Sequence, residues 1–500
     1  MLTTLVFLPI VGALIIGLFI REPSRVRMVA AAVTILELVL AIWIFFLFQQ
    51  GDYQNIDGMG FVEKFAGWIP TLQIQYHIGI DGLSAPLILL CALLGMCAVF
   101  ASWNVSLRVR EYFIWLLVLQ TAVTGVFVSL DLILFFIFWE LELLPMYFLI
   151  SIWGTGRKEY SAMKFLIFTL LGGAFMLIGI LAVFLSVGSF NIVDLPFLLE
   201  GAGLILPSGF IFTLFFIAFA VKLPVWPVHS WLPDAHTDAP TAVSIMLAGV
   251  LLKMGGYGIL RITVGMFPYE AQRFAWVLAL LAVISVLYGA FITLRQTDLK
   301  RLVAFSSISH MGYVLLGVSS VVGVNGAVSP VGLTGAAMQM FTHGTITGLL
   351  FLLVGMVYDK AHTRHIPDLG GLATRMPVIA VGFLVAGMAS LGLPGTSGFI
   401  GEILVFLGTF DVWPALTVAA VFGIVITAGY ILWAIQRTLF GPALDRFKDI
   451  GDASVVEMVP MVALIAVILA VGIYPVFLTD VFAGGLDPLV RILDAGAKLP

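Results

Sequence analysis

Charged side chains are scarce in this chain. Asp, Glu, Lys and Arg make up only 10% of its 500 residues, whereas 61% of the residues are hydrophobic. Soluble domains carry roughly 25% charged residues, so the polar residues here are too few to cover a soluble core. This composition excludes a soluble globular protein. The absence of a basic stripe also argues against a nucleic-acid-binding protein.

Cysteine is almost missing as well. The two cysteines, Cys91 and Cys97, lie in one apolar run, which excludes a disulfide framework and any four-cysteine iron–sulfur or zinc site. No G-x-G-x-x-G motif, P-loop or haem-attachment pattern occurs. His236 and Asp238 do not complete a metal-ligand set. We therefore expect no cofactor and no metal in this chain. If the chain drives any energy-requiring process, the energy must come from a partner subunit or an ion gradient.

Long apolar runs dominate what is present, and the mean hydropathy is +1.13. A membrane-spanning helix needs about 20 apolar residues. The strands of a membrane barrel alternate in polarity, so their hydropathy signal is much weaker than the one seen here. The sequence predicts an all-α, polytopic fold with fourteen spans, the first being a retained helix rather than a signal peptide. The predicted spans are 2–20, 28–49, 82–103, 112–130, 131–153, 162–187, 208–228, 240–261, 274–294, 301–322, 331–357, 376–410, 413–436 and 456–478.

Positive charge is distributed unevenly between the connecting segments. When these are assigned alternately to the two sides, one side holds 17 Lys and Arg residues and the other holds 5. The positive-inside rule places the richer side in the cytoplasm and both termini outside it. This predicts a multi-pass protein of the plasma (inner) membrane. The two remaining cations, Lys222 and Lys253, lie inside spans.

Two of the spans should be broken. Pro224 and Pro227 lie at the end of one, and Leu-Pro-Gly-Thr-Ser-Gly at 393–398 interrupts the other. Because transporters often place such breaks in inverted repeats, we expect two inverted five-helix repeats. The predicted divisions are N-terminal helices with an extracytoplasmic loop (1–111), a first repeat (112–261), a second repeat (262–437) and a C-terminal helix with a tail (438–500).

Charged groups at membrane depth are costly and usually face an interior or a wet cavity. The candidates are Glu37, Glu140, Glu142, Lys222, Lys253 and Glu402. Glu140 and Glu142 point about 200° apart on a helix, so only one can face Lys222. We favour Glu140, as a functional or a merely static ion pair, and expect Glu142 to face a neighbouring helix or subunit. Glu37 is interpreted as an interface contact or a protonated side chain.

Lys253 is predicted to be a proton carrier, because burial favours a neutral lysine that accepts and releases protons; a lysine that extends to the interface is the alternative. Glu402 is the predicted terminal proton carrier. The alternative is a carboxylate that caps the broken helix or satisfies its backbone groups. Because histidine suits proton relays, His229, His310 and His343 are candidates, each with a purely structural alternative.

The segment 229–238 after the first break is interpreted as a loop that forms either a proton inlet or a polar plug. If this segment is an inlet, a proton would enter from the cytoplasm near the first break, reach Lys253 and leave from Glu402.

Long motifs over nearly the whole chain resemble the antiporter-like membrane subunits of respiratory complex I. They are Tyr76 to Pro86, Trp139-Glu140 with Pro145, Val221 to His236, Lys253-Met-Gly-Gly-Tyr, Asp298 to Gly312, and Leu393 to Phe399 with Glu402. An acid at Glu402 is similar to the M type (chain 4), because the L and N types more often carry lysine there. The chain length is also typical of the M type.

The resemblance implies proton translocation within an NADH:quinone oxidoreductase. Glu140 and Lys222 would form a modulating ion pair, and Lys253 and Glu402 would carry protons along a path lined by the three histidines. L-type and N-type neighbours would flank the chain, while NADH, FMN, iron–sulfur clusters and quinone would bind to partner subunits. An Mrp-type cation/proton antiporter, a hydrogenase-like or ferredoxin-driven relative, and a membrane scaffold remain open alternatives.

Overall fold

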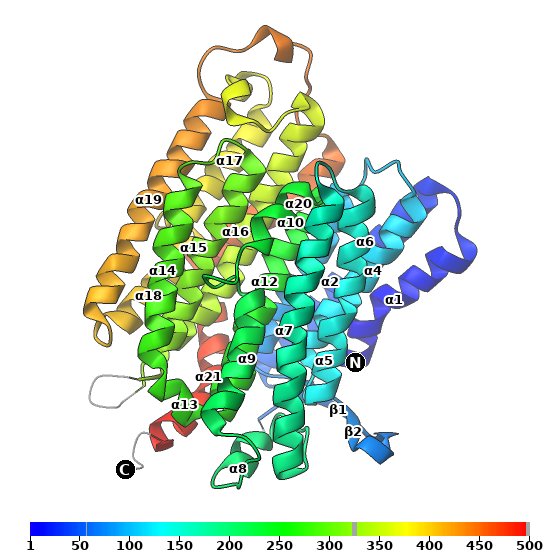
Figure 1. Cartoon of the computed structure of the whole chain (residues 1–500). Helices are drawn as coiled ribbons and strands as arrows, with labels where there is room; N and C mark the ends of the chain where they lie inside the picture. Colours follow the sequence, from blue (N-terminus) through cyan, green and yellow to red (C-terminus); the bar gives the residue numbers. More distant parts are fainter. Residues whose placement is uncertain (57, 323–327, 497–500) are drawn as a thin grey trace.

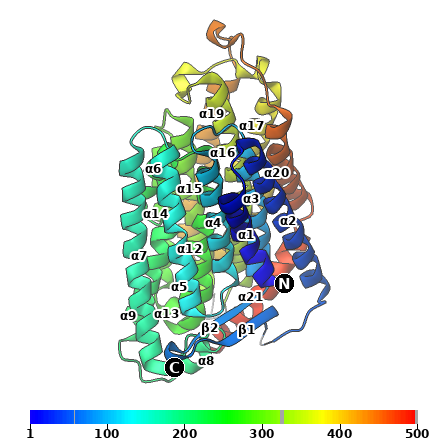
Figure 2. The ribbon, with the colours of Figure 1, turned by 90° about the vertical axis from the view of Figure 1, so that its right-hand side faces the viewer.

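The computed structural model describes residues 1–56, 58–322 and 328–496. Long helices stand side by side in a bundle, with a small β-hairpin and several short helices at one end (Figure 1, Figure 2). Among the described residues, twelve helices are long and apolar enough to cross a membrane. Pairing the shorter helices α9 with α10 and α17 with α18 adds two broken spans, which gives the predicted fourteen. The all-α, polytopic prediction is confirmed.

The bounds of the spanning elements follow chain order. They are α1 (Leu2–Phe19), α2 (Pro23–Gln50), α3 (Ser84–Ala101), α4 (Val109–Val128), α5 (Leu132–Leu141) with α6 (Leu143–Trp153), α7 (Lys158–Val187), α9 (Ser208–Lys222) with α10 (Trp231–Asp238), the continuous series α11 (Thr241–Met246), η2 (Leu247–Leu251), α12 (Leu252–Gly258) and η3 (Ile259–Val264), then α14 (Ala275–Thr293), α15 (Leu299–Val318), α16 (Pro330–Ala361), α17 (Pro377–Ser390) with α18 (Ser397–Phe410), α19 (Pro414–Leu439) and α20 (Val455–Ile473).

The two ends of the bundle differ in composition. One end, here called the basic end, gathers the connections that the sequence assigns to the cytoplasm. Contacts hold them together there: Trp153 Nε1 donates to the Leu107 carbonyl, Thr155 N to the Asp238 carbonyl, and Arg364 pairs with Asp298. The other end, here called the hairpin end, carries the hairpin and helices α8 (Leu195–Leu199) and α13 (Pro268–Arg273). The alternation of the connecting segments thus agrees with the predicted grouping of charge.

The first predicted break lies between α9 and α10. The prediction of a loop at 229–238 is wrong from Trp231 onward, because that stretch forms the buried helix α10. Its polar residues suggested a loop, but the helix completes the span towards the basic end. The Trp231 indole donates to the Val221 carbonyl at 2.9 Å, so a backbone group near the break keeps a hydrogen-bond partner.

The second predicted break separates α17 from α18. Gly392 and Gly395 take left-handed backbone angles, with φ of +75° and +90°, which a residue with a Cβ rarely adopts. The turn packs closely on α20, where a Cβ at Gly472 would overlap with the backbone of Gly395 and Thr396. α9–α10 leads towards the basic end and α17–α18 leads away from it (Figure 1), as expected for inverted repeats.

Two elements at the hairpin end were not foreseen. Within the predicted N-terminal loop, β1 (Gly60–Ile69) pairs with β2 (Ile74–Ile80) in an antiparallel hairpin. In the predicted C-terminal tail, α21 (Val476–Gly496) is an amphipathic helix that lies across the bundle end (Figure 2). A Cβ at Gly82 or Gly485 would overlap with the facing backbone, so this helix docks at very close range.

Candidate functional site

Four buried titratable side chains from four different spans meet in the middle of the bundle. The Nζ atom of Lys253 lies 2.8 Å from Nδ1 of His343 and also donates to the Ala248 carbonyl. The ring of His343 lies 5.6 Å from that of His310. Nδ1 of His310 lies 3.4 Å from Oε1 of Glu402. We call this series of four side chains the central chain.

The central chain is enclosed by protein. None of its members is more than 4% exposed. A cavity of about 10 Å³ lies among His310, His343, Ser390 and Glu402, which is about the space that one water molecule needs. Because Lys253, His310 and His343 lie near the middle of their helices and Glu402 lies just after a break, the chain runs across the bundle rather than along it.

Small residues allow this convergence. A Cβ at Gly255 would overlap with the backbone of α9, and one at Gly249 would overlap with Leu94. Lys253 itself lies between two π-helical segments, η2 and η3, a feature frequent at functional sites. Gly392 leaves the space that the last member of the central chain occupies, because a Cβ there would overlap with Oε2 of Glu402.

Lys222 forms a second buried site with two acids. The structure corrects the predicted partner: Lys222 Nζ forms its ion pair with Glu142, not with Glu140. The positive charge of Lys222 interacts electrostatically with both carboxylates. The Glu140 side chain lies against Gly173. The rings of Trp139 and Phe165 lie 5.1 and 5.4 Å from the ammonium group. Lys222 is thus a buried cation that pairs with Glu142 and interacts electrostatically with Glu140.

The structure places His229 away from the central chain. It lies in the first break, where its ring packs edge-on against Tyr288 at 4.8 Å. His229 Nδ1 has no hydrogen-bond partner within the described part of the chain. The structure thus brings together His310 and His343, but it does not bring His229 to them.

His236 and Lys300 are polar groups that the sequence reasoning did not select. His236 is fully buried, stacks on Phe351 at 4.5 Å, and has no partner for either ring nitrogen among the described residues. The charges of Lys300 and Lys253 both act on it. The available sequence signal for His236 was its place beside the first break. Lys300 was assigned to a segment that connects two spans.

Lys300 lies at a hollow of about 510 Å³ at the basic end. Its Nζ donates to the Ala239 carbonyl, and it is only 5% exposed. Thr241, Asp359 and His362 also line the hollow. The hollow at the basic end thus contains Lys300, whose charge acts on the buried His236.

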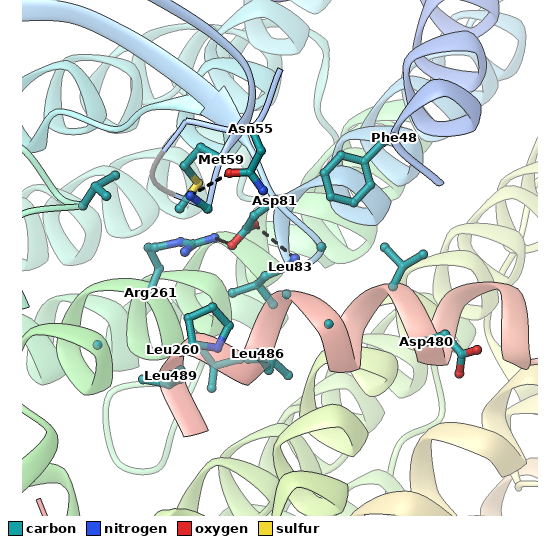
Figure 3. Close-up of a pocket in the computed structure, with 18 of the residues that line it drawn as sticks. Phe48, Asn55, Met59, Asp81, Leu83, Leu260, Arg261, Asp480, Leu486 and Leu489 are labelled. Atoms are coloured by element: carbon teal, nitrogen blue, oxygen red, sulfur yellow. Dashed lines mark hydrogen bonds and ion pairs between the residues drawn. The ribbon is translucent and has the colours of Figure 1, made fainter. Parts of the chain in front are cut away.

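A larger hollow, of about 870 Å³, lies at the hairpin end (Figure 3). Its lining includes residues from η3, from α21 and from the turn before α3, together with Tyr53, Asn55, Gly58 and Met59. The ion pair of Asp81 and Arg261 lies in its wall. Asp480 of α21 lies further along the same hollow. This hollow contains charged side chains that the sequence reasoning did not assign.

Glu37 occupies a separate polar cluster between α2, α3 and α4. Its Oε1 accepts hydrogen bonds from Gln120 Nε2 at 3.1 Å and Thr124 Oγ1 at 3.5 Å. Gln120 also donates to the Cys91 carbonyl at 3.0 Å. No group of three or more His, Cys, Asp or Glu side chains suited to a metal occurs in the described ranges.

Comparison with known proteins gives a consistent set of relatives. Residues 129–427 match the family described as NADH:quinone oxidoreductase/Mrp antiporter, transmembrane. The chain is 39% identical to NADH-quinone oxidoreductase subunit M of Rhodobacter capsulatus, over 98% of this chain and 96% of the relative. It is 38% identical to NAD(P)H-quinone oxidoreductase chain 4 of Gloeobacter violaceus, over 98% and 93% of the two chains.

Solved structures agree in fold. A chain of respiratory complex I from Thermus thermophilus matches with a TM-score of 0.86 and 28% identity, over 100% of this chain and 99% of that one. A chain of the Mrp complex from Dietzia sp. matches with a TM-score of 0.82 and 23% identity, over 98% of both chains. The latter likeness is one of fold alone.

Proposed function

Because this chain belongs to the NADH:quinone oxidoreductase/Mrp antiporter family of transmembrane proteins and is similar to M-type (chain 4) relatives over nearly its whole length, we propose that it is a proton-translocating membrane subunit of an NADH:quinone oxidoreductase. The observation that carries the proposal is the central chain. A buried lysine, two histidines and a glutamate lie in series where isolated charges would be costly.

The proton inlet is assigned to the hollow at the basic end, which the positive-inside rule places in the cytoplasm. Its polar groups lead to Lys300 and then to His236, on which the charge of Lys253 acts. His229 is assigned only a secondary role in proton entry at the first break, because its ring packs against Tyr288 rather than against a member of the central chain. The proposed inlet thus lies beside the first break, where the sequence-based hypothesis also puts it.

Lys253 accepts the proton and passes it to His343, whose ring nitrogen is within hydrogen-bond distance. A neutral imidazole has one donor and one acceptor nitrogen, so a ring can receive a proton on one side and release one on the other. His310 is the next relay, and Glu402 is the final acceptor before release. One water in the small cavity would complete the connections between the rings.

Lys222 and its two acids modulate this transfer. α9, which ends at Lys222, packs against α12 close to Lys253. When Lys222 is paired, its charge is offset, and when it separates from Glu142, its field acts on the proton held by Lys253. A unit charge at about 4–10 Å is worth about 2–4 kcal/mol at an effective dielectric of about 20. That range is sufficient to change proton occupancy by a factor of ten or more.

Partner subunits supply the energy in this proposal. NADH, FMN, iron–sulfur clusters and quinone bind outside this chain, and quinone reduction there drives the separation of the Lys222 pair. L-type and N-type antiporter-like subunits are the proposed neighbours. The long exposed apolar face of α7, with Ile167, Leu171 and Leu185, suits lipid or such a neighbour.

The test uses the assembled complex in sealed vesicles. Lys253→Met should abolish this subunit's share of NADH-driven proton uptake while electron transfer from NADH to an artificial acceptor stays normal. Lys448→Met is the matched control, because Lys448 is exposed at the basic end. Full proton translocation by Lys253→Met would overturn the proposal, and sodium-dependent uptake would favour the Mrp-type alternative.

A further inference from the structure

The span that carries Lys253 continues to the hollow at the hairpin end. Lys253, Tyr257 and Arg261 are spaced four residues apart, which places them on one face of the helix. Arg261 and its neighbour Leu260 line the hollow of about 870 Å³ (Figure 3). A direct outlet from Lys253 along this face would therefore be only two helical turns long.

The contacts along this face are well defined. The Tyr257 hydroxyl donates to the Phe127 carbonyl at 3.3 Å. Arg261 Nε donates to the Tyr257 oxygen at 3.4 Å, and its guanidinium lies 5.5 Å from the Tyr257 ring. Arg261 Nη2 donates to Oδ2 of Asp81. The guanidinium thus lies between the tyrosine hydroxyl and the carboxylate.

Asp81 is held so that it keeps Arg261 in this position. Its Oδ1 accepts hydrogen bonds from the backbone N–H groups of Leu83 and Ser84 at 3.1 and 3.0 Å. The two side chains of the ion pair are largely buried, at 14% and 8% exposure. An ion pair fixed by backbone contacts has little freedom to swing into the hollow.

Arginine is suited to blocking proton transfer. A proton relay needs a group that accepts a proton at each step, and a guanidinium has five donors, no acceptor and no accessible neutral form in proteins. Water can donate and accept, so a water in place of the guanidinium would join Tyr257 to Asp81. The presence of Arg261 prevents that connection.

We propose that Arg261, fixed by Asp81 against Tyr257, closes a direct proton outlet from Lys253 to the hairpin-end hollow and thereby directs protons through His343 to Glu402. This inference rests on the proposed function of Lys253 as a proton carrier. The alternative is that the ion pair only ties the start of α3 to η3. The two differ in what the loss of the guanidinium does to proton leakage.

The experiment measures leakage without turnover. The whole complex is reconstituted in vesicles that contain a pH-sensitive dye, a pH gradient is imposed without NADH, and its decay is followed. Arg261→Ala should speed the decay several-fold, because water then joins Tyr257 to Asp81. Arg261→Lys should stay as tight as the unmodified complex, because the neighbouring Asp81 carboxylate favours the charged ammonium form, which is a donor without an acceptor.

A second variant tests where the leak begins. Combining Arg261→Ala with Lys253→Met should restore tightness, whereas a leak through damaged packing would persist. If Arg261→Ala fails to assemble, Arg261→Gln takes its place, because its amide retains a contact with Asp81 and adds an acceptor oxygen.

Normal tightness of an assembled Arg261→Ala or Arg261→Gln complex would overturn the inference, and so would a leak that persists without Lys253. The proposed function is judged separately, by NADH-driven uptake in Lys253→Met alone.

Discussion

Lys222 interacts electrostatically with two carboxylates rather than one. It forms its ion pair with Glu142, while Glu140 remains under its electrostatic influence. One oxygen on each acid lacks a hydrogen-bond partner among the described residues. An unpaired buried charge is strongly unfavourable, so we propose that Glu140 pairs with Lys222 when Glu142 loses its charge. The proposed modulating group therefore has three members.

Replacing the acids one at a time tests this arrangement. Glu142→Gln and Glu140→Gln should each reduce proton translocation in part, because one carboxylate remains for Lys222. The double variant should lose more than the sum of the two, as expected for groups that share a partner. Proton uptake per NADH, normalised to acceptor activity, gives the comparison. Equal losses in Glu142→Gln and the double variant would instead assign the whole role to Glu142.

Glu37 allows a prediction about stability. Glu37→Gln retains the shape and an acceptor oxygen for Gln120, so thermal stability should change little. Glu37→Ala should cost about 1–3 kcal/mol, because the Gln120 amide is left buried without that partner. Leu36→Ala, at an exposed position on the same helix, is the control in a thermal-unfolding assay of the complex. A large loss in Glu37→Gln would show that a carboxyl group is required.

At the scale of elements, the broken helix α17–α18 positions Glu402. Gly392 leaves room for the carboxylate and takes a positive φ, whereas Gly395 takes a positive φ with no atom within 4 Å of its missing Cβ. The two glycines therefore share a backbone requirement but differ in their effect on Glu402.

Gly392→Ala should displace the Glu402 carboxylate from His310 and sharply reduce proton translocation. Gly395→Ala carries a similar backbone strain, of about 1–2 kcal/mol, without touching the acid. Comparing both in the vesicle assay, with assembly checked by acceptor activity, separates strain from displacement. Equal loss in the two variants would contradict the role assigned to Gly392.

The sequence predicts the breaks better than the contacts beside them. Proline and glycine mark both interruptions, and buried charge marks Lys253 and Glu402. The choice of Glu140 over Glu142 failed because the 200° argument states only that the two acids cannot face Lys222 together and does not select one of them. Local sequence also does not show that α5 ends at Leu141 and α6 begins at Leu143. Pro145 removes an N–H in the first turn of α6, and this was the available signal.

Polar content explains other differences. The sequence predicts a loop in place of α10 because Asp234, His236 and Asp238 lower its hydropathy, although contacts with another span satisfy the two aspartates. Ser161 Oγ donates to Asp238 at 2.6 Å, and Lys164 Nζ donates to Asp234 at 2.7 Å. Such long-range partners cannot be read from local sequence. The same holds for His236, whose neighbours Phe351 and Lys300 come from distant helices.

At the scale of the whole molecule, α21 and the start of α3 connect the last and early parts of the chain. Gly82 and Gly485 bring their backbones together at the hairpin end. The adjacent hollow includes residues from both segments. The docking of α21 therefore shapes the wall that contains Asp81 and Arg261.

Gly485→Ala should loosen this docking, because its Cβ would overlap with the backbone of Leu83. Gly484→Ala is the matched control, since nothing lies within 4 Å of a Cβ at that position. Limited proteolysis of the complex should cleave near α21 faster in Gly485→Ala than in Gly484→Ala. Identical cleavage rates in the two variants would show that the close approach is not required.

The crosswise course of the central chain has an electrical consequence. A charge that crosses the whole membrane does work of about 2.3 kcal/mol per 100 mV, but movement parallel to the bilayer plane does almost none. In the proposed path, the steps from Lys253 to Glu402 are therefore nearly insensitive to voltage. If protons follow that path, the membrane potential opposes chiefly the loading of Lys253 and the release from Glu402, so those two steps determine how strongly an energised membrane slows the cycle.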